Sequence, residues 1–180
     1  ENARFARQIR QEPYLACSMG LDACALLSND SLRAAVGTAA VVDIGFHVDI
    51  AARRDHPRDC MNRYGMRPVE RLRRFGALGP RTVGTNCLHL APEELGLLHR
   101  AGACVVHTPR SNALEDLSQA PLSQFWESGL VVGLGTDAVD SSLWAEMQAA
   151  YLLAPHNIAQ PGSIVPSQAT QMLLHDNGTI

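Results

Sequence analysis

Lysine is missing from this sequence, and all 15 of its basic residues are arginines. The 18 acidic residues outnumber them, so the formal net charge is −3 at pH 7. A protein that binds nucleic acid generally presents an excess of positive charge to the phosphates. We therefore expect no nucleic-acid partner, whereas this composition leaves the binding of a small molecule open.

The sequence also lacks a long apolar run and a Cys-x-x-Cys pair. No apolar stretch approaches the roughly 20 residues that span a bilayer, so we expect no membrane partner. The five cysteines are an odd number without a paired motif, which is typical of a reducing, cytoplasmic location. Residues 1–13 contain neither a Met nor the apolar core of a secretory signal. We expect them to come from the interior of a longer protein.

Short apolar runs alternate regularly with amphipathic ones. We predict strands at 14–21, 41–50, 81–90, 103–107 and 130–137. We predict a helix that opens near Ser28–Asp30, and further helices at 63–80, 91–102, 120–129, 141–153 and 166–175. Pro68 and Pro92 suit the first turn of a helix, and Gly76 suits a helix end. Such an alternation predicts an α/β protein with a parallel sheet and crossover helices, folded as one domain over residues 1–180.

Polar side chains recur where the predicted strands end. They are Asp22, His47, Asp49, Asn86, His89, His107 and Asp137. The carboxyl ends of parallel strands meet at one edge, and in a β/α barrel this edge carries the functional site. The pattern therefore favours a site here. Since His47 and Asp49 share one face of a strand, they either belong to this site or form a hydrogen-bonded polar pair.

Four segments in a fixed order carry a resemblance to a known family. They are YGMRPVERLRRFGALGP, NCLHLAPEELGLL, VVHTPRSN and GLVVGLGTDAVDSSLWAEMQAAYLL. Together they resemble the amidohydrolase superfamily, in the branch of triazine chlorohydrolases, S-adenosylhomocysteine and cytosine-type deaminases, and the SsnA-like aminohydrolases of selenium metabolism. The resemblance implies a partial (β/α)8 TIM barrel with parallel strands and outer helices. It covers strands 4–8, the C-terminal half of the metal-dependent hydrolase barrel, so that the N-terminal strands and the small β domain are missing from this sequence.

The resemblance further implies a metal-dependent hydrolase or deaminase that acts on C–N bonds of a small heterocyclic substrate. In such enzymes a divalent metal, usually zinc, activates a water molecule, and a Glu moves its proton. Asp137 falls on a position that binds the metal and accepts a proton from the attacking water, so it is the implied catalytic residue. The implied substrate-binding residues are Asp22, His47, His89 and His107, although a core position for His107 is an equal alternative.

Several implied site positions depart from the family pattern. This pattern is close to G-F-H-x-H-x-A-E, whereas residues 45–52 place Asp49 at the metal-ligand His and Ala52 at the catalytic Glu. Asn86 stands at a second metal-ligand His, and Asp22 at a substrate-facing His. The implied metal positions are Asp137, Asp49 and Asn86. The carboxylates of Asp22, Asp49 and Asp137 are expected to meet at one edge, and such oxygen donors suit Mg²⁺, Mn²⁺ or Ca²⁺ better than zinc. The alternative is a catalytically inactive scaffold, subunit or ligand-binding protein without a metal. A homo-oligomer is compatible with either hypothesis.

Other notable residues have simpler interpretations. The arginine-rich stretch is predicted to form a solvated helix face, with an anionic partner or subunit contact as the alternative; it contains Arg53, Arg54, Arg58, Arg71, Arg73 and Arg74. Four histidines are predicted at the surface: His56, His99, His156 and His175. Trp126 and Trp144 are predicted to pack against other apolar residues.

Overall fold

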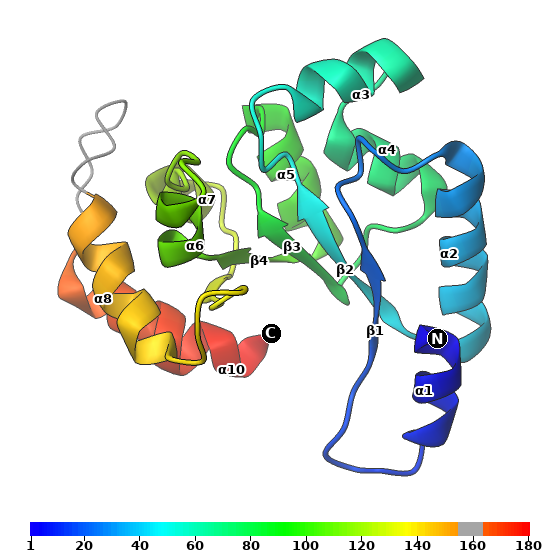
Figure 1. Cartoon of the computed structure of the whole chain (residues 1–180), viewed down its shortest axis with the longest axis horizontal. Helices are drawn as coiled ribbons and strands as arrows, with labels where there is room; N and C mark the ends of the chain where they lie inside the picture. Colours follow the sequence, from blue (N-terminus) through cyan, green and yellow to red (C-terminus); the bar gives the residue numbers. More distant parts are fainter. Residues whose placement is uncertain (155–163) are drawn as a thin grey trace.

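A single sheet of parallel strands organises the protein. The computed structural model describes residues 1–154 and 164–180. The strands are β1 (Ser18–Leu21), β2 (Gly45–Ile50), β3 (Thr82–Asn86), β4 (Cys104–His107) and β5 (Val132–Leu134). They are all parallel and pair in sequential order from β1 to β5. Helices connect them and pack around them, which confirms the predicted α/β fold with parallel strands and outer helices (Figure 1).

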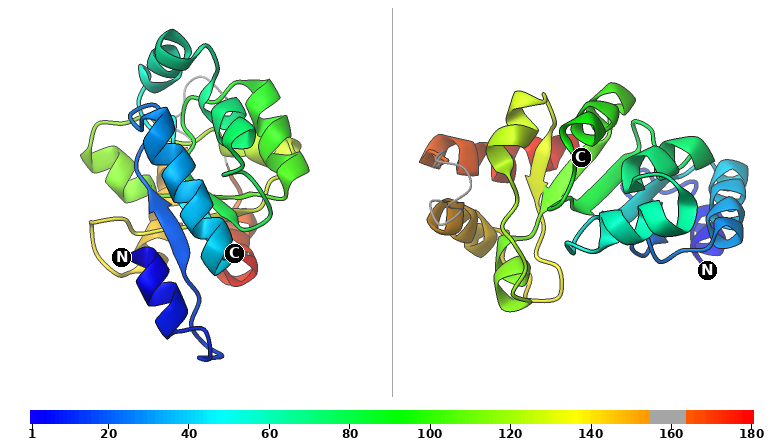
Figure 2. Two further views of the ribbon diagram at one scale, coloured as in Figure 1. Left: turned by 90° about the vertical axis from the view of Figure 1, so that its right-hand side faces the viewer. Right: turned by 90° about the horizontal axis from the view of Figure 1, so that it is seen from above.

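The helices follow the strands in a regular order. Between β1 and β4 lie α2 (Asn29–Val42), α3 (His56–Tyr64), α4 (Pro68–Phe75) and α5 (Pro92–Ala101). Between β4 and β5 lie α6 (Pro109–Leu114) and α7 (Leu122–Glu127). After β5 come α8 (Leu143–Leu153), α9 (Pro166–Gln171), the π-helix η2 (Met172–Asp176) and α10 (Asn177–Thr179), while α1 (Asn2–Gln8) precedes β1. Figure 2 shows α1 beside α2 at the β1 end of the sheet and α8 beside the C-terminal helices at the β5 end.

The helix ends follow the predicted signals. The Ser28 hydroxyl accepts a hydrogen bond from the Ser31 amide and caps α2. Pro68 and Pro92 occupy the first turns of α4 and α5, where a missing amide hydrogen costs nothing. Gly76 ends α4 in the left-handed conformation, with φ of +82°. These local signals therefore place the helix boundaries correctly where they occur.

Some predicted boundaries are wrong. Residues 41 and 42 belong to α2, because Val42 continues the buried stripe of Leu32 and Ala39, and the helix ends only at Asp43. The predicted helix 63–80 is divided between the end of α3 and the shorter α4. The helices α1, α3 and α6 were not predicted, since they lack a wide apolar stripe.

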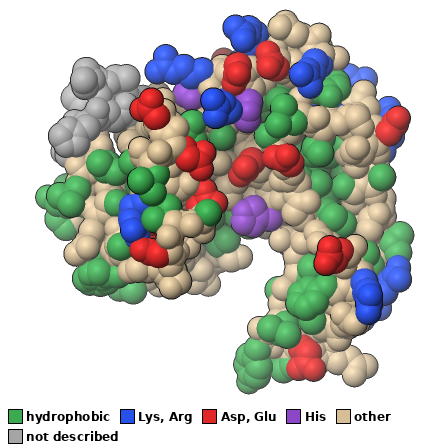
Figure 3. All heavy atoms as spheres, viewed as in Figure 1, with side chains coloured by type: hydrophobic (Ala, Val, Ile, Leu, Met, Phe, Trp, Pro, Cys, Tyr) green, Lys and Arg blue, Asp and Glu red, His purple; other side chains and the backbone are tan. Residues whose placement is uncertain are grey.

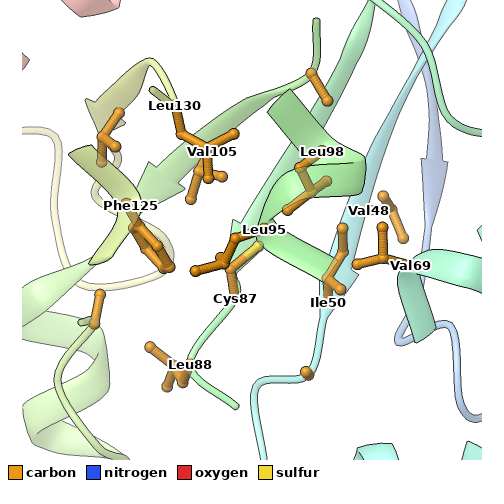
Figure 4. Packing of buried hydrophobic residues seen from close by; sticks show 14 of the residues in the cluster. Val48, Ile50, Val69, Cys87, Leu88, Leu95, Leu98, Val105, Phe125 and Leu130 are labelled. Carbon is orange, nitrogen blue, oxygen red and sulfur yellow. The ribbon is translucent and has the colours of Figure 1, made fainter. Parts of the chain in front are cut away.

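The core lies between the sheet and the helices α4, α5 and α7. Val48 and Ile50 of β2 are fully buried and lie next to Val69 of α4 (Figure 4). Cys87, directly after β3, packs beside Leu95 of α5 in the same cluster. Because these side chains occupy the helix-covered face, the opposite face of β2 is left for His47 and Asp49.

Arg71 does not belong to a solvated face, contrary to the prediction for the arginine-rich stretch. It is fully buried, and its guanidinium lies 3.6 Å from the centre of the Tyr64 ring. It donates hydrogen bonds to the backbone oxygens of Cys24 and Leu27 and to Asn29 Oδ1. The other arginines of the stretch are exposed, as predicted.

Two further surface assignments need correction. His56 is buried rather than exposed, because it opens α3 against the body of the protein. Trp144 is 60% exposed and so does not pack in the core. Trp126 is partly buried and packs against the core. His99 and His175 are exposed as predicted, and His156 lies outside the described residues. Within the described ranges, no helix is long and apolar enough to cross a membrane.

Candidate functional site

The predicted site residues lie at the carboxyl ends of the strands. Asp49 is the second-last residue of β2, Asn86 is the last residue of β3, and His107 is the last residue of β4. Asp22 directly follows β1, and Asp137 follows β5 after two residues. Since the strands are parallel and in register, these residues share one edge of the sheet.

Asp49 is the centre of a small hydrogen-bond network. Its Oδ1 accepts hydrogen bonds from Thr85 Oγ1 and from Asn86 Nδ2, the latter at 3.2 Å. On the other side of Asn86, its Oδ1 accepts a hydrogen bond from Thr108 Oγ1 at 3.5 Å. Thr108 Oγ1 also lies 3.3 Å from Asn112 Oδ1. The network thus runs from β2 across β3 to the start of α6.

The backbone conformation at Asn86 and Cys87 helps to position the side chains of this network. Asn86 and Cys87 both have positive φ, at +64° and +55°. Such conformations are uncommon for residues other than glycine and persist only where surrounding contacts hold them. The Cys87 amide donates to the oxygens of Ile50 and Thr85, which holds this bend against β2. The bend sets the Asn86 side chain beside Asp49.

Asp137 makes no hydrogen bond to this network among the residues that the structure describes. Its side chain is exposed, its φ is +51°, and its Oδ2 accepts a hydrogen bond of 2.5 Å from Ser111 Oγ of α6. Asp49 and Asn86 therefore contact each other, whereas Asp137 binds to a different element. Within residues 1–154 and 164–180, no three His, Cys, Asp or Glu side chains are grouped closely enough to hold a metal ion.

The three predicted metal positions do not fit zinc in this arrangement. The Asn86 amide group uses its nitrogen to donate to Asp49, and one oxygen of Asp49 already accepts two hydrogen bonds. Zinc in proteins prefers four close ligands that include imidazole or thiolate groups. An amide and two carboxylates on separate elements provide no such set.

His107 occupies a core position. It is only 2% exposed and shares the buried face of β4 with Val105. Burial lowers the pKa of His107 to about 3, so the ring is neutral in the folded protein. Among the described residues its Nδ1 has no hydrogen-bond partner. His107 is therefore buried but not fully hydrogen-bonded, and its assignment to substrate binding stays a prediction.

Asp22 and His47 lie at the surface. His47 is on the same face of β2 as Asp49, as the alternation predicts, and Val48 and Ile50 are on the opposite face. Asp22 Oδ1 accepts a hydrogen bond of 2.7 Å from the Ala23 amide. Asp22 therefore caps the turn after β1 and makes no hydrogen bond to the Asp49 network in the part of the chain that the structure describes.

Ala52 and His89 border this network. Ala52 is buried and carries no group that can transfer a proton. His89 is half-buried, and its pKa is lowered by burial first and then by the charges of Arg54 and His56. The backbone amide of His89 donates to the Ala51 oxygen, which keeps His89 next to the end of β2.

The sequence analysis missed several polar residues of this edge. They are Thr85, Thr108, Ser111 and Asn112. The signal for Thr85 is its position opposite Asp49 in the parallel register. The signal for the other three is the segment HTPRSN, in which only His107 was assigned a role.

The fold and the position of this edge define an incomplete β/α barrel of the type that carries its site at the carboxyl ends of the strands. The sequence pattern of the Amidohydrolase family matches residues 15–173, and the chain belongs to this family.

Two curated relatives are deaminases of larger size. A 5-methylthioadenosine/S-adenosylhomocysteine deaminase of Syntrophomonas wolfei is 33% identical over 71% of this chain and 31% of its own length. A 5'-deoxyadenosine deaminase of Methanothrix thermoacetophila is 27% identical over 96% of this chain and 43% of its own length. The chain thus spans less than half the length of these relatives.

A solved structure supports the fold. The adenosine deaminase of Xanthomonas campestris with bound zinc superposes with a TM-score of 0.85 at 20% identity, over 95% of this chain and 40% of that one. This agreement confirms the predicted fold class and its extent as part of a larger barrel. It also provides a zinc-bound protein of the same fold.

Proposed function

We propose that this chain is an amidohydrolase-family protein that binds a small, nucleoside-like heterocycle at the Asp49 network and does not hydrolyse it. One observation carries the proposal: Asn86 Nδ2 donates a hydrogen bond to Asp49 Oδ1. The side chains at two implied metal-ligand positions therefore bind each other. The ligand class is supported by the relatives, whose names specify adenosine-like compounds.

The chemistry of hydrolytic deamination supports the loss of turnover. A water molecule must lose a proton as it attacks the ring carbon, and the leaving amine must gain one. A group beside the reacting atoms has to move these protons. The resemblance puts this group at Ala52, whose methyl side chain cannot do so. Asp137 can accept a proton, but it lies apart from Asp49 and binds Ser111.

The groups that are present suit recognition of a heterocycle. Asp49 has a second carboxylate oxygen that can accept a hydrogen bond from an exocyclic amine. Asn112 is fully buried, and its Nδ2 has no partner in the described part of the chain, so it is a free donor near the end of the network. A purine-type ring offers both an amine donor and ring-nitrogen acceptors, which match these two groups.

A metal-dependent deaminase is the second candidate, and the names of the relatives favour it. For this function Asp137, Asp49 and Asn86 would have to rearrange to accept a cation, and their oxygen atoms suit a hard cation better than zinc. The present side-chain arrangement supplies no route for the proton.

Calorimetric titration with adenosine, combined with an ammonia-release assay, separates the two candidates. We expect adenosine to bind, Asp49→Ala to weaken binding at least about tenfold, and no ammonia to form with or without added Zn²⁺ or Mn²⁺. Ammonia release that depends on the metal would overturn the binding-only proposal in favour of the enzyme. Absence of adenosine binding would contradict both.

A reversion experiment tests the assignment of the altered positions. The triple variant Asp49→His, Ala52→Glu and Asn86→His introduces imidazole ligands and a proton carrier at the positions that the resemblance implies. In a full-length protein that also carries the strand-1 His-x-His pair of the family, we expect it to bind more zinc than the parent, measured by equilibrium dialysis and metal analysis. If this full-length triple variant binds no more zinc than its parent, the assignment of these positions is wrong.

A further inference from the structure

A cationic groove lies next to the Asp49 network. It has a volume of about 430 Å³ and is lined by Arg54, Pro57, Arg58, Met61, Asn62, Arg67 and His89. Three of these residues are arginines, and none of the lining residues is acidic. In a protein with a net charge of −3, such a concentration of positive charge in one groove indicates a specific role.

The arginines of the groove are only partly neutralised. Arg54 is exposed and forms no ion pair within the described residues. Arg58 lies on the surface, and its Nε is 3.7 Å from Asp59. Arg67 is fixed by Glu94, at 2.7 Å, and by a hydrogen bond from its Nη2 to the His89 backbone oxygen. The groove thus combines one oriented guanidinium with two that are free to turn toward a ligand.

The charges around the groove contribute to the pKa of His89. Burial is the largest cause of the lowered pKa of this imidazole, the positive charges of Arg54 and His56 lower it further, and Asp55 opposes them more weakly. A second cavity of about 330 Å³ shares Arg54 and His89 with the groove, and its lining also includes Arg53, Asp55 and Asp116. The acidic residues Asp55 and Asp116 thus line the neighbouring cavity and not the groove.

The groove includes His89, which lies close in the chain to the proposed ligand site. The His89 amide donates to the Ala51 oxygen at 3.2 Å, only two residues beyond Asp49, and Asn86 lies three residues before His89. On the face shown in Figure 3, basic side chains, histidines and some acidic side chains lie together above a row of further acidic side chains. A ligand that reaches both places needs a heterocycle at one end and an anion at the other.

We propose that the groove of Arg54, Arg58, Arg67 and His89 binds a phosphate group, so that a nucleoside monophosphate spans the groove and the Asp49 network. Guanidinium groups bind phosphate through paired, charge-assisted hydrogen bonds, and several donors around one groove match its three terminal oxygens. Phosphate binding rests on the groove alone, whereas the nucleotide form of the ligand rests on the proposed function.

Calorimetric titration with inorganic phosphate, adenosine and adenosine 5'-monophosphate tests each part. The double variant Arg54→Gln and Arg58→Gln is expected to weaken binding of inorganic phosphate and of the monophosphate at least about tenfold and to leave adenosine binding unchanged. The matched control is Arg73→Gln with Arg74→Gln, which removes the same charge from exposed positions of α4. It should bind all three compounds like the parent.

The outcomes distinguish this proposal from the proposed function. If inorganic phosphate does not bind to the parent, or binds equally well to the double variant of the groove, the groove proposal is overturned. It is also overturned if the control variant loses as much affinity, because net charge would then account for binding. If phosphate binds through the groove but adenosine does not bind, the nucleoside site fails and the groove remains. Nuclear magnetic resonance gives a second readout, since phosphate should raise the pKa of His89 in the parent and not in the double variant of the groove.

Discussion

Arg71 connects α4 to the segment between β1 and α2. Its guanidinium binds oxygens of Cys24, Leu27 and Asn29, and it stacks on Tyr64. These partners are far from Arg71 in the sequence, and a chain segment without regular structure depends on them to satisfy its carbonyl groups. Arg71 therefore helps to hold the loop that leads from β1 to α2, together with the Tyr64 hydroxyl, which donates to the Leu27 oxygen at 2.7 Å.

Replacing Arg71 is expected to destabilise the fold strongly. Arg71→Met keeps the length of the side chain but leaves the Cys24 oxygen and Asn29 Oδ1 without their donor, so the free energy of unfolding should fall by about 3 kcal/mol. Urea unfolding followed by circular dichroism measures this change. Arg74→Met removes an exposed arginine of the same helix and should alter stability by no more than about 0.5 kcal/mol. Equal effects of the two substitutions would contradict the structural role of Arg71.

His107 should make stability depend on pH. Burial lowers its pKa from 6.5 to about 3 in the folded state. Between these pH values the unfolded chain binds a proton that the folded chain does not bind, so stability is fully present above 6.5 and is lost as the pH falls through this window. From about pH 7 to about pH 5 the loss through His107 is about 2 kcal/mol.

Urea unfolding at several pH values tests this effect. His107→Gln removes the buried imidazole and should flatten the pH dependence by the amount given above. His47→Gln removes an exposed imidazole from β2 and should keep the pH dependence of the parent. If His107→Gln and the parent lose equal stability between about pH 7 and about pH 5, the imidazole is not held neutral by burial.

At the scale of elements, the start of β2 depends on a close approach of two backbones. A Cβ atom at Gly45 would overlap the backbone oxygen of Arg81, just before β3. The Phe46 amide donates to this oxygen at 2.9 Å, so the contact is part of the β2–β3 pairing. Glycine is thus required here for packing, and its backbone conformation is not the reason.

A pair of glycine substitutions tests this requirement. Gly45→Ala should lower the free energy of unfolding by about 1–3 kcal/mol, because the strands have to separate to admit the methyl group. Gly37→Ala, in the middle of α2 where the new methyl group meets open space, should raise it by about 0.5–1 kcal/mol. Thermal or urea unfolding measures both. A neutral Gly45→Ala would show that the β2–β3 contact is looser than described.

The sequence was sufficient to predict elements that carry strong local signals. Apolar runs located all five strands, and Pro68, Pro92 and Gly76 located helix ends. The helix α6 was missed because its buried residues include Ser111 and Asn112, which are polar and give no apolar stripe.

The same limits apply to the site. The contact between Asp49 and Thr85 follows from the parallel register and was within reach of the sequence. The contact between Asp49 and Asn86 was not, because it depends on the positive φ of Asn86. The bond between Ser111 and Asp137 was not, because it depends on the unpredicted helix α6. The burial of Arg71 depends on long-range partners, and nothing in its neighbourhood distinguishes it from Arg73 or Arg74.

At the scale of the whole molecule, the sheet has two edges, β1 and β5, within the described residues. At β5 the side chain of Asn177 takes the place of a neighbouring strand. Its Oδ1 accepts a hydrogen bond from the Leu134 amide at 2.7 Å, and its Nδ2 donates to the Leu134 oxygen at 3.1 Å. An unpaired edge can bind another chain, so Asn177 limits self-association through β5.

Removing this carboxamide should expose the edge. Asn177→Leu preserves the approximate size of the side chain but leaves the Leu134 amide and oxygen unpaired. We expect stronger self-association than in the parent as concentration rises, and a loss of about 1–3 kcal/mol in the free energy of unfolding. Sedimentation velocity measures the first effect and urea unfolding the second. Thr179→Val in α10 is the control. A variant that sediments like the parent at all concentrations would show that the β5 edge does not promote self-association.

The sequential order of the strands has a consequence for how the chain folds during synthesis and for how its gene can change in length. Each strand joins the sheet beside the strand that precedes it in the chain, and no connection has to pass through another. A nascent chain can therefore dock one strand and its helix at a time, in the order of synthesis. For the same reason, a gene that gains or loses one strand with its helix at either edge of the sheet changes the number of strands. The remaining strands and helices keep their arrangement.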